Sequence, residues 1–152
     1  MPYASVVTRY GPPEVLVWSP VDMPEPGSGQ IRIRVQAAGV SPTDPPIRSG
    51  DMQQVFPLPR PAVLGFEAAG VVDALGPAVT GVAAGDQVTA MLPGLGGYGE
   101  YALASWWTVK PANVSWADAA ALPASAEAAI GVLRQLRVTS GETLLILGAA
   151  GR

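Results

Sequence analysis

The chain has 152 residues, of which 49% are apolar and 14% charged, and its net charge is -3. It contains neither cysteine nor histidine, which excludes disulfides, catalytic thiols, histidine bases and the Cys/His sites that zinc prefers. The sequence has no Lys/Arg cluster of the kind that binds nucleic acid or an anionic membrane. It also shows no secretory signal and no membrane span. We therefore expect a cytoplasmic protein whose partner is a small molecule or another protein.

The first third of the chain predicts short antiparallel strands. Residues 5–9 and 15–18 flank a Gly-Pro-Pro breaker and predict a hairpin. Residues 30–38 alternate apolar and polar side chains, as a half-buried antiparallel strand does. In the loop that follows, Ser41 or Thr43 is a candidate cap for a short helical turn.

Residues 62–76 form an apolar run with three glycines, and the carboxylate of Glu67 lies inside it. A buried carboxylate is costly unless it is paired or hydrogen-bonded. If this run is a buried strand, Glu67 has a partner or a task. The alternative is a half-exposed strand with Glu67 on the solvent face.

Further strands are predicted at residues 87–92, 100–104 and 106–110. Short strands with frequent turns are typical of a closed or nearly closed β-barrel. A different pattern begins at Ser115, which starts a capping box ahead of an alanine-rich helix. Pro123 ends or kinks that helix, and we expect a second one at about residues 125–137.

The last residues combine a uniformly apolar stretch, residues 143–147, with the glycine turn Gly148-Ala-Ala-Gly151. A buried parallel strand followed by such a turn is where a dinucleotide pyrophosphate meets the N-terminus of a helix. The helix, the second strand and the acidic residue that complete this fingerprint do not follow in the sequence. A frayed terminus is the alternative interpretation of this half motif.

Eight motifs stand in order along the sequence, at residues 10–16, 39–44, 47–50, 64–72, 85–88, 97–101, 120–123 and 141–151. Together they resemble the medium-chain dehydrogenase/reductase superfamily, specifically its zinc-free quinone oxidoreductase-like branch. The resemblance implies a mainly β protein with α+β additions: a GroES-like, partly open β-barrel followed by a helix and one Rossmann-type strand. It implies a catalytic, substrate-binding domain at residues 1–120. Residues 121–152 would be the linking helix and the truncated start of a Rossmann nucleotide-binding domain.

The resemblance also implies an NADPH-dependent, zinc-independent reductase of quinones or α,β-unsaturated carbonyls, with an apolar carbonyl, quinone or polyketide-like substrate. Asp44 and Glu67 stand where the family lines or supports its cleft. The hydroxyls of Ser41, Thr43 and Tyr98 are the candidate donors to a developing oxyanion.

The same resemblance assigns cofactor contacts to Gly148, Gly151 and Ala128. Ala128 stands where the family often has Thr, and Pro46 stands where it often has Tyr, close to the nicotinamide. Because most of a Rossmann domain does not follow in this sequence, the chain offers little surface to hold NADPH.

Two other functions remain open at this stage. The domain is either a cofactor-free small-molecule binder or a non-redox cyclase or isomerase, with Glu67, Asp44 and Glu127 as acid/base candidates in an apolar cleft. Alternatively, it is an interaction module in which an unpaired strand at residues 144–147 pairs with a partner edge and forms a homodimer.

Overall fold

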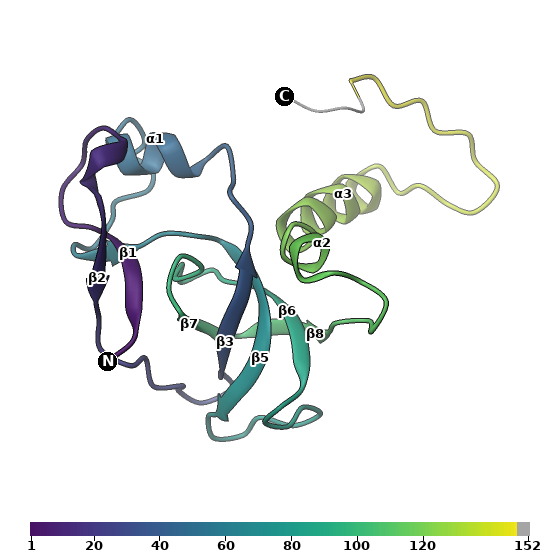
Figure 1. Ribbon diagram of the computed structural model, residues 1–152. Coiled ribbons are helices and arrows are strands. Elements are labelled where there is room, and N and C mark those ends of the chain that lie inside the picture. The colour runs from purple at the N-terminus through teal and green to yellow at the C-terminus, as the bar shows by residue number, and fades with distance from the viewer. Residues whose placement is uncertain (149–152) are drawn as a thin grey trace.

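The computed structural model, which describes residues 1–148, is built around two open antiparallel sheets (Figure 1). The smaller sheet has the strand order β2-β1-β4 and the larger one β7-β3-β5-β6-β8. Their strands are β1 (Tyr3–Val7), β2 (Leu16–Pro20), β3 (Ile31–Ala38), β4 (Ala62–Val63), β5 (Glu67–Leu75), β6 (Gln87–Met91), β7 (Tyr101–Ala104) and β8 (Trp106–Val109). The partly open barrel implied by the resemblance is confirmed, and the sheets do not close.

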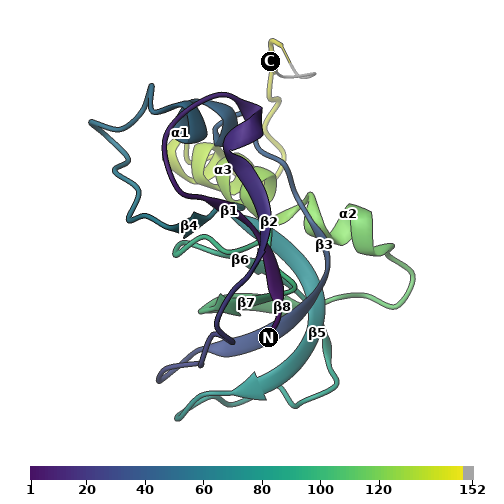
Figure 2. The same cartoon turned by 60° about the vertical axis from the view of Figure 1, so that its left-hand side comes forward.

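The pair β3 and β5 forms the centre of the larger sheet, and Figure 2 shows the two strands curving together. The predicted alternation holds at its start, because Ile31 and Ile33 are fully buried. It ends at a register shift between Val35 and Ala37, where a bulge re-aims the side chains. Gly70 on β5 has no room for a side chain, since an added Cβ would overlap the carbonyl oxygen of Arg34.

The smaller sheet contains the predicted hairpin of β1 and β2, entered through a short 3-10 helix, η1 (Pro13–Val15). A backbone hydrogen bond of 2.9 Å from Ser5 N to Tyr98 O joins this sheet to the segment before β7. The smaller sheet and the helix α1 (Asp44–Ser49) enclose a second apolar cluster, in which Val7, Ile47 and Leu64 are buried. The candidate site described below lies at the edge of this cluster.

Two helices follow the strands, α2 (Trp116–Ala120) and α3 (Pro123–Gln135). The predicted cap of α2 is confirmed, because Ser115 Oγ accepts a hydrogen bond of 3.1 Å from the Asp118 backbone N. Helix α3 begins two residues earlier than predicted, since Pro123 occupies its first turn, where proline costs no hydrogen bond. Helix α2 packs against β3 and β5, whereas α3 contacts β6 and has no buried residue.

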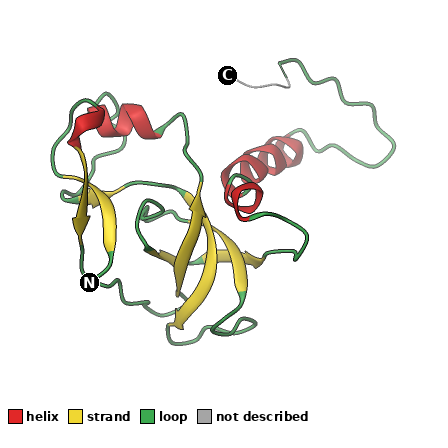
Figure 3. Cartoon of the chain, in the orientation of Figure 1, coloured by secondary structure: helices red, strands yellow, loops and turns green. Residues whose placement is uncertain are grey.

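The strand predicted at residues 143–147 is not formed, and Figure 3 shows the segment after α3 as a loop. Leu145, Ile146 and Leu147 are exposed. A parallel strand needs a hydrogen-bonded neighbour and cover on both faces, and within residues 1–148 no segment pairs with this one. None of the helices in the described part of the chain is long and apolar enough to cross a membrane.

Candidate functional site

Asp44 is the centre of a buried polar group at the start of α1. Its side chain is only 4% exposed. The Oδ2 atom accepts hydrogen bonds from the Ser41 backbone N, at 2.7 Å, and from the Tyr98 hydroxyl, at 2.6 Å. The other carboxylate atom, Oδ1, is buried and has no protein partner among the described residues. The carboxylate is therefore held firmly on one side and left unpaired on the other.

Asp44 also orders the loop that precedes it. The Ser41 backbone N donates to Asp44, and the Ser41 hydroxyl accepts a hydrogen bond of 3.2 Å from the Thr43 backbone N. Thr43 is the N-cap residue of α1 but forms no side-chain capping bond. Neither Ser41 nor Thr43 caps the helix as predicted: the Thr43 backbone is helical, with φ -79° and ψ -24°, rather than extended as in a typical N-cap, and the Ser41 hydroxyl is used by Thr43 N.

Tyr98 lies in the glycine-rich segment before β7 and meets Asp44 through its hydroxyl. Its backbone N donates to the Leu64 carbonyl at 3.0 Å, which fixes the ring beside the apolar cluster. Burial raises the pKa of Tyr98 well above its ordinary value, and the hydrogen bond to Asp44 and the negative charges of Asp44 and Glu67 raise it further. The phenol therefore stays protonated, with its proton directed at Asp44 rather than at the pocket.

Glu67 is the first residue of β5 and is 6% exposed. Its Oε2 accepts a hydrogen bond of 2.8 Å from the backbone N of Ala124, in the first turn of α3. Backbone N–H groups at the start of a helix lack partners within the helix, and the helix dipole favours a negative charge there. The prediction of a buried, partnered carboxylate is confirmed, and the solvent-face alternative is wrong.

Gly39 makes room for this carboxylate, because a Cβ at that position would overlap Glu67 Oε1. The Gly39 backbone N also donates to the Glu67 carbonyl at 3.2 Å. Glu67 therefore joins the end of β3, the start of β5 and the start of α3. The sequence does not indicate this partner, because a backbone N–H such as that of Ala124 has no residue-type signal.

A pocket of about 270 Å³ lies beside Asp44. Most of its wall is apolar, and its lining residues are Leu16, Val40, Asp44, Pro45, Arg48, Leu64 and Tyr98. Arg48 is not among the predicted site residues, although it lies inside the motif at residues 47–50. Its Nε atom is buried and, like Asp44 Oδ1, has no protein partner in the described chain.

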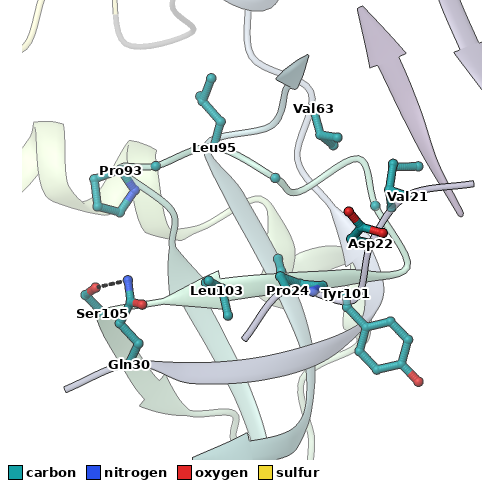
Figure 4. Close-up of a pocket in the computed structure, with 15 residues that line it drawn as sticks. Val21, Asp22, Pro24, Gln30, Val63, Pro93, Leu95, Tyr101, Leu103 and Ser105 are labelled. Atoms are coloured by element: carbon teal, nitrogen blue, oxygen red, sulfur yellow. Dashed lines mark hydrogen bonds between the residues drawn. The ribbon is translucent and has the colours of Figure 1, made fainter. Parts of the chain in front are cut away.

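A second pocket, of about 330 Å³, lies between the loop after β2 and strand β7 (Figure 4). Its polar groups are Asp22 together with Gln30 and Ser105, whose side chains are joined by a hydrogen bond of 3.3 Å. None of the predicted catalytic residues lines it. We therefore place the candidate site at Asp44 and not in this larger pocket.

The residues predicted to contact a cofactor lie apart from Asp44. Ala128 and Gly148 line one exposed hollow between α3 and the segment after it, whereas Gly151 lies outside the described residues. Gly148 has a φ of 72°, and a Cβ added there would meet nothing within 4 Å. Glu127 is exposed on α3 and does not lie in an apolar cleft as predicted. Within residues 1–148, no group of three acidic residues could hold a metal ion.

Comparisons with known proteins agree with this fold. Residues 27–114 match the alcohol dehydrogenase GroES-like domain. The chain is 38% identical to a quinone oxidoreductase of Sus scrofa over 95% of its length, and 40% identical to a 2-haloacrylate reductase of a Burkholderia species over 66%. It spans only 45% and 30% of the length of these relatives.

Among solved structures, the Escherichia coli quinone oxidoreductase complexed with NADPH superposes with a TM-score of 0.78 at 29% sequence identity. The match covers 88% of this chain and 41% of that one. The family match covers more than half of the sequence, and both the relative and the structure agree with it in order and in fold. The chain therefore belongs to the medium-chain dehydrogenase/reductase superfamily, in its quinone oxidoreductase-like branch.

Proposed function

We propose that this chain is the substrate-binding part of a zinc-independent, NADPH-dependent oxidoreductase that acts on quinones or α,β-unsaturated carbonyls. The observation that carries the proposal is the apolar pocket beside Asp44. Arg48 and Tyr98 also line this pocket. Such a combination of apolar wall and few polar groups is typical of small-molecule sites. The names of the relatives support the reaction class, and the sequence lacks the Cys and His ligands of a zinc site. Residues 1–120 would be the substrate domain and residues 121–152 the start of the nucleotide domain.

The described residues do not fit NADPH by themselves. The stretch at residues 143–147 is not a strand, and Gly148 faces open space rather than a cradle for phosphate. NADPH dependence is thus proposed from the relatives alone, and we assign this chain only the tasks its own residues support. Leu16, Val40 and Leu64 bind the apolar part of a substrate and exclude water, and Arg48 supplies a positive charge in the same wall.

The test is a titration of the 152-residue protein with cyclohex-2-enone, followed residue by residue by NMR. We expect shifts at Val40, Leu64 and Arg48, and we expect NADPH added alone not to bind in the micromolar range. The variant Val40→Phe should weaken enone binding by obstructing the pocket. Val109→Phe is the matched control, since Val109 is also exposed but lies on β8. Shifts confined to the pocket of Figure 4, or equal effects of the two variants, would contradict the proposal.

A second candidate function is cofactor-free acid/base chemistry, as in an isomerase or cyclase. The unpartnered, buried Oδ1 of Asp44 favours it. Glu67 is less suited to this role, because its carboxylate binds the start of α3. The distinguishing measurement is deuterium uptake by cyclohex-2-enone in D2O with the protein and no cofactor. Exchange that is faster than in buffer and is lost in Asp44→Asn would support this candidate, and exchange at the buffer rate would exclude it.

Two further expectations concern assembly and location. Leu144 to Leu147 expose apolar side chains without a strand neighbour in the described chain, which supports a homodimer formed through this segment. Sedimentation equilibrium of the protein and of Leu145→Lys would test it: a dimer that becomes a monomer in the variant is the expected result. A cytoplasmic location stays a prediction.

A further inference from the structure

The pocket of Figure 4 is lined by three polar side chains that the proposed function does not use, those of Asp22, Gln30 and Ser105. Its volume of about 330 Å³ lies within the range of small-molecule sites. Figure 4 shows Asp22 on one side of the pocket and the hydrogen-bonded pair of Gln30 and Ser105 on the other. The wall between them is mainly apolar and includes Val63 and Leu103.

Asp22 is the one charged residue among those that line this pocket. It is exposed, so a ligand can reach its carboxylate, and within residues 1–148 it forms no ion pair. Arg32 contacts the pocket wall, because its Nη1 atom donates a hydrogen bond of 3.0 Å to the Pro24 carbonyl. Its guanidinium is already paired with Glu25, at 3.3 Å, and with Asp73, at 2.7 Å. This side of the pocket therefore carries a net negative charge, which attracts a cation.

The other side of the pocket offers hydrogen-bond donors. Gln30 Nε2 donates to Ser105 Oγ at 3.3 Å, and Gln30 Oε1 accepts a hydrogen bond of 3.0 Å from the Gly27 backbone N. Because Ser105 Oγ is the acceptor in this pair, its own proton remains free to bind a ligand. The pair lies at the exposed surface, so a ligand atom can reach the hydroxyl. A neutral oxygen atom is the acceptor that suits this donor.

The wall between the two sides, residues 93–96, is held in place by the fold. Leu95 has a φ of 65°, in the left-handed region that residues other than glycine rarely adopt. Such a conformation persists only where the surrounding structure enforces it, and here Leu95 packs against the second apolar cluster. The pocket is therefore formed before a ligand arrives, which lowers the entropic cost of binding.

We infer that the pocket of Figure 4 binds small organic cations in which an apolar chain joins an ammonium group to a neutral oxygen, as in an amino alcohol. The ammonium group pairs with Asp22, and the oxygen accepts a hydrogen bond from Ser105. The chain between them packs against Val63 and Leu103. Such an amine is protonated at neutral pH, since its pKa resembles that of lysine. The inference is independent of the proposed function, which concerns the pocket beside Asp44.

The test compares 6-aminohexan-1-ol with 6-hydroxyhexanoate, which have the same number of carbon atoms and a terminal hydroxyl but opposite charges. Each is titrated into the 152-residue protein at low salt and followed by NMR at the backbone amides of Leu95 and Leu103. We expect the amine to bind at least about fivefold more tightly, because Asp22 attracts it and repels the carboxylate. Equal binding, tighter binding of the carboxylate, no binding of the amine, or shifts at Val40 and Leu64 instead would overturn the inference.

The variant Asp22→Asn tests the charged side of the pocket. It removes the charge, keeps the size of the side chain and lies in an exposed loop, so the fold should not change. We expect the ratio of the two affinities to fall by at least about threefold. The matched control is Glu14→Gln, which removes the same charge from an exposed residue of η1 outside the pocket and should leave the ratio unchanged. Equal ratios in the wild type and Asp22→Asn, or equal effects of the two variants, would overturn the inference.

The variant Ser105→Ala tests the other side. It removes the donor to the ligand oxygen and should weaken the binding of 6-aminohexan-1-ol by about threefold to tenfold, the usual effect of one hydrogen bond. Hexylamine, which has no oxygen, is the matched ligand, and its affinity should not change. An unchanged affinity for 6-aminohexan-1-ol, or an equal loss for both amines, would overturn the inference.

Discussion

The strand region at residues 3–109 and the C-terminal region at residues 121–148 differ in how far their apolar side chains are buried. In the strand region, Ile31, Ile33 and Leu92 are completely buried. In the C-terminal region, α3 has no buried residue, and Leu147 is 85% exposed. Apolar residues thus form a core only where another element of the same chain packs against them. The strands supply one another, while α3 and the segment after it have little to cover them in the described chain.

The two regions meet at a polar contact rather than through a shared core. The Glu67 carboxylate binds the Ala124 backbone N, and Gly39 leaves the space that the carboxylate occupies. A contact of this kind fixes the position and direction of a helix without burying its apolar face. The comparison therefore predicts that substitutions in the strands change global stability, whereas substitutions in α3 change only the helix.

The largest expected effect comes from a matched pair of isoleucine truncations. Ile33→Ala should lower the free energy of unfolding by about 2–5 kcal/mol, because it leaves a cavity in the core. Ile130→Ala should change it by less than about 0.5 kcal/mol, since Ile130 is 46% exposed and alanine favours helix. Urea unfolding measures both. Equal losses would mean that α3 is part of the core.

The next effect concerns the buried polar group of the strand region. Tyr98→Phe removes the donor to Asp44 Oδ2 and should cost about 1.5–3 kcal/mol, the usual range for a hydrogen bond to a charged group. Tyr3→Phe is the control, because Tyr3 is 41% exposed and its hydroxyl makes no protein hydrogen bond in the described chain. A loss as small as that of the control would show that the Ser41 N–H alone satisfies Asp44.

The effect of Tyr98→Phe on stability should also depend on pH. The pKa of Tyr98 is raised in the folded protein, so the unfolded chain releases this proton first as the pH rises. The stability that Tyr98 contributes is therefore fully present below its unfolded pKa of about 10 and is lost as the pH rises above it. The stability difference between the wild type and Tyr98→Phe should shrink above that pH. A constant difference up to strongly alkaline pH would contradict the buried, Asp44-bonded phenol.

A smaller effect is expected at the joint between the two regions. Glu67→Ala removes the acceptor for Ala124 N and should destabilise the start of α3 by about 1–2 kcal/mol, as the loss of a helix cap does. Glu67→Gln keeps an acceptor of the same shape and is the matched control. Hydrogen exchange should accelerate in α3 more than in β3 or β5. Equal acceleration in all three would mean that the contact supports the whole fold.

The accuracy of the sequence predictions follows the same division. The alternation at Ile31 and Ile33 and the cap at Ser115 were predictable, because each depends on neighbouring residues alone. The strand at residues 143–147 was wrong because an apolar run needs a pairing partner, which its own residues do not reveal. The hydrogen bond from Tyr98 to Asp44 was not predictable either, since it joins residues 54 positions apart in the sequence. The sequence thus indicated Asp44, Ser41 and Tyr98, but neither Arg48 nor the contacts that join these residues.

The smallest expected effect lies at the far end of α3, where Arg137 has a φ of 54°. The helix has its C-cap at Leu136, so Arg137 occupies the position that most often adopts the left-handed conformation and favours glycine. Arg137→Gly should stabilise the last turn of α3 by about 0.5–1 kcal/mol. Because α3 buries no residue, this gain should slow hydrogen exchange in the helix without moving the urea midpoint of the strands. A shift of that midpoint would show that the two regions unfold together. They would then differ in burial but not in stability.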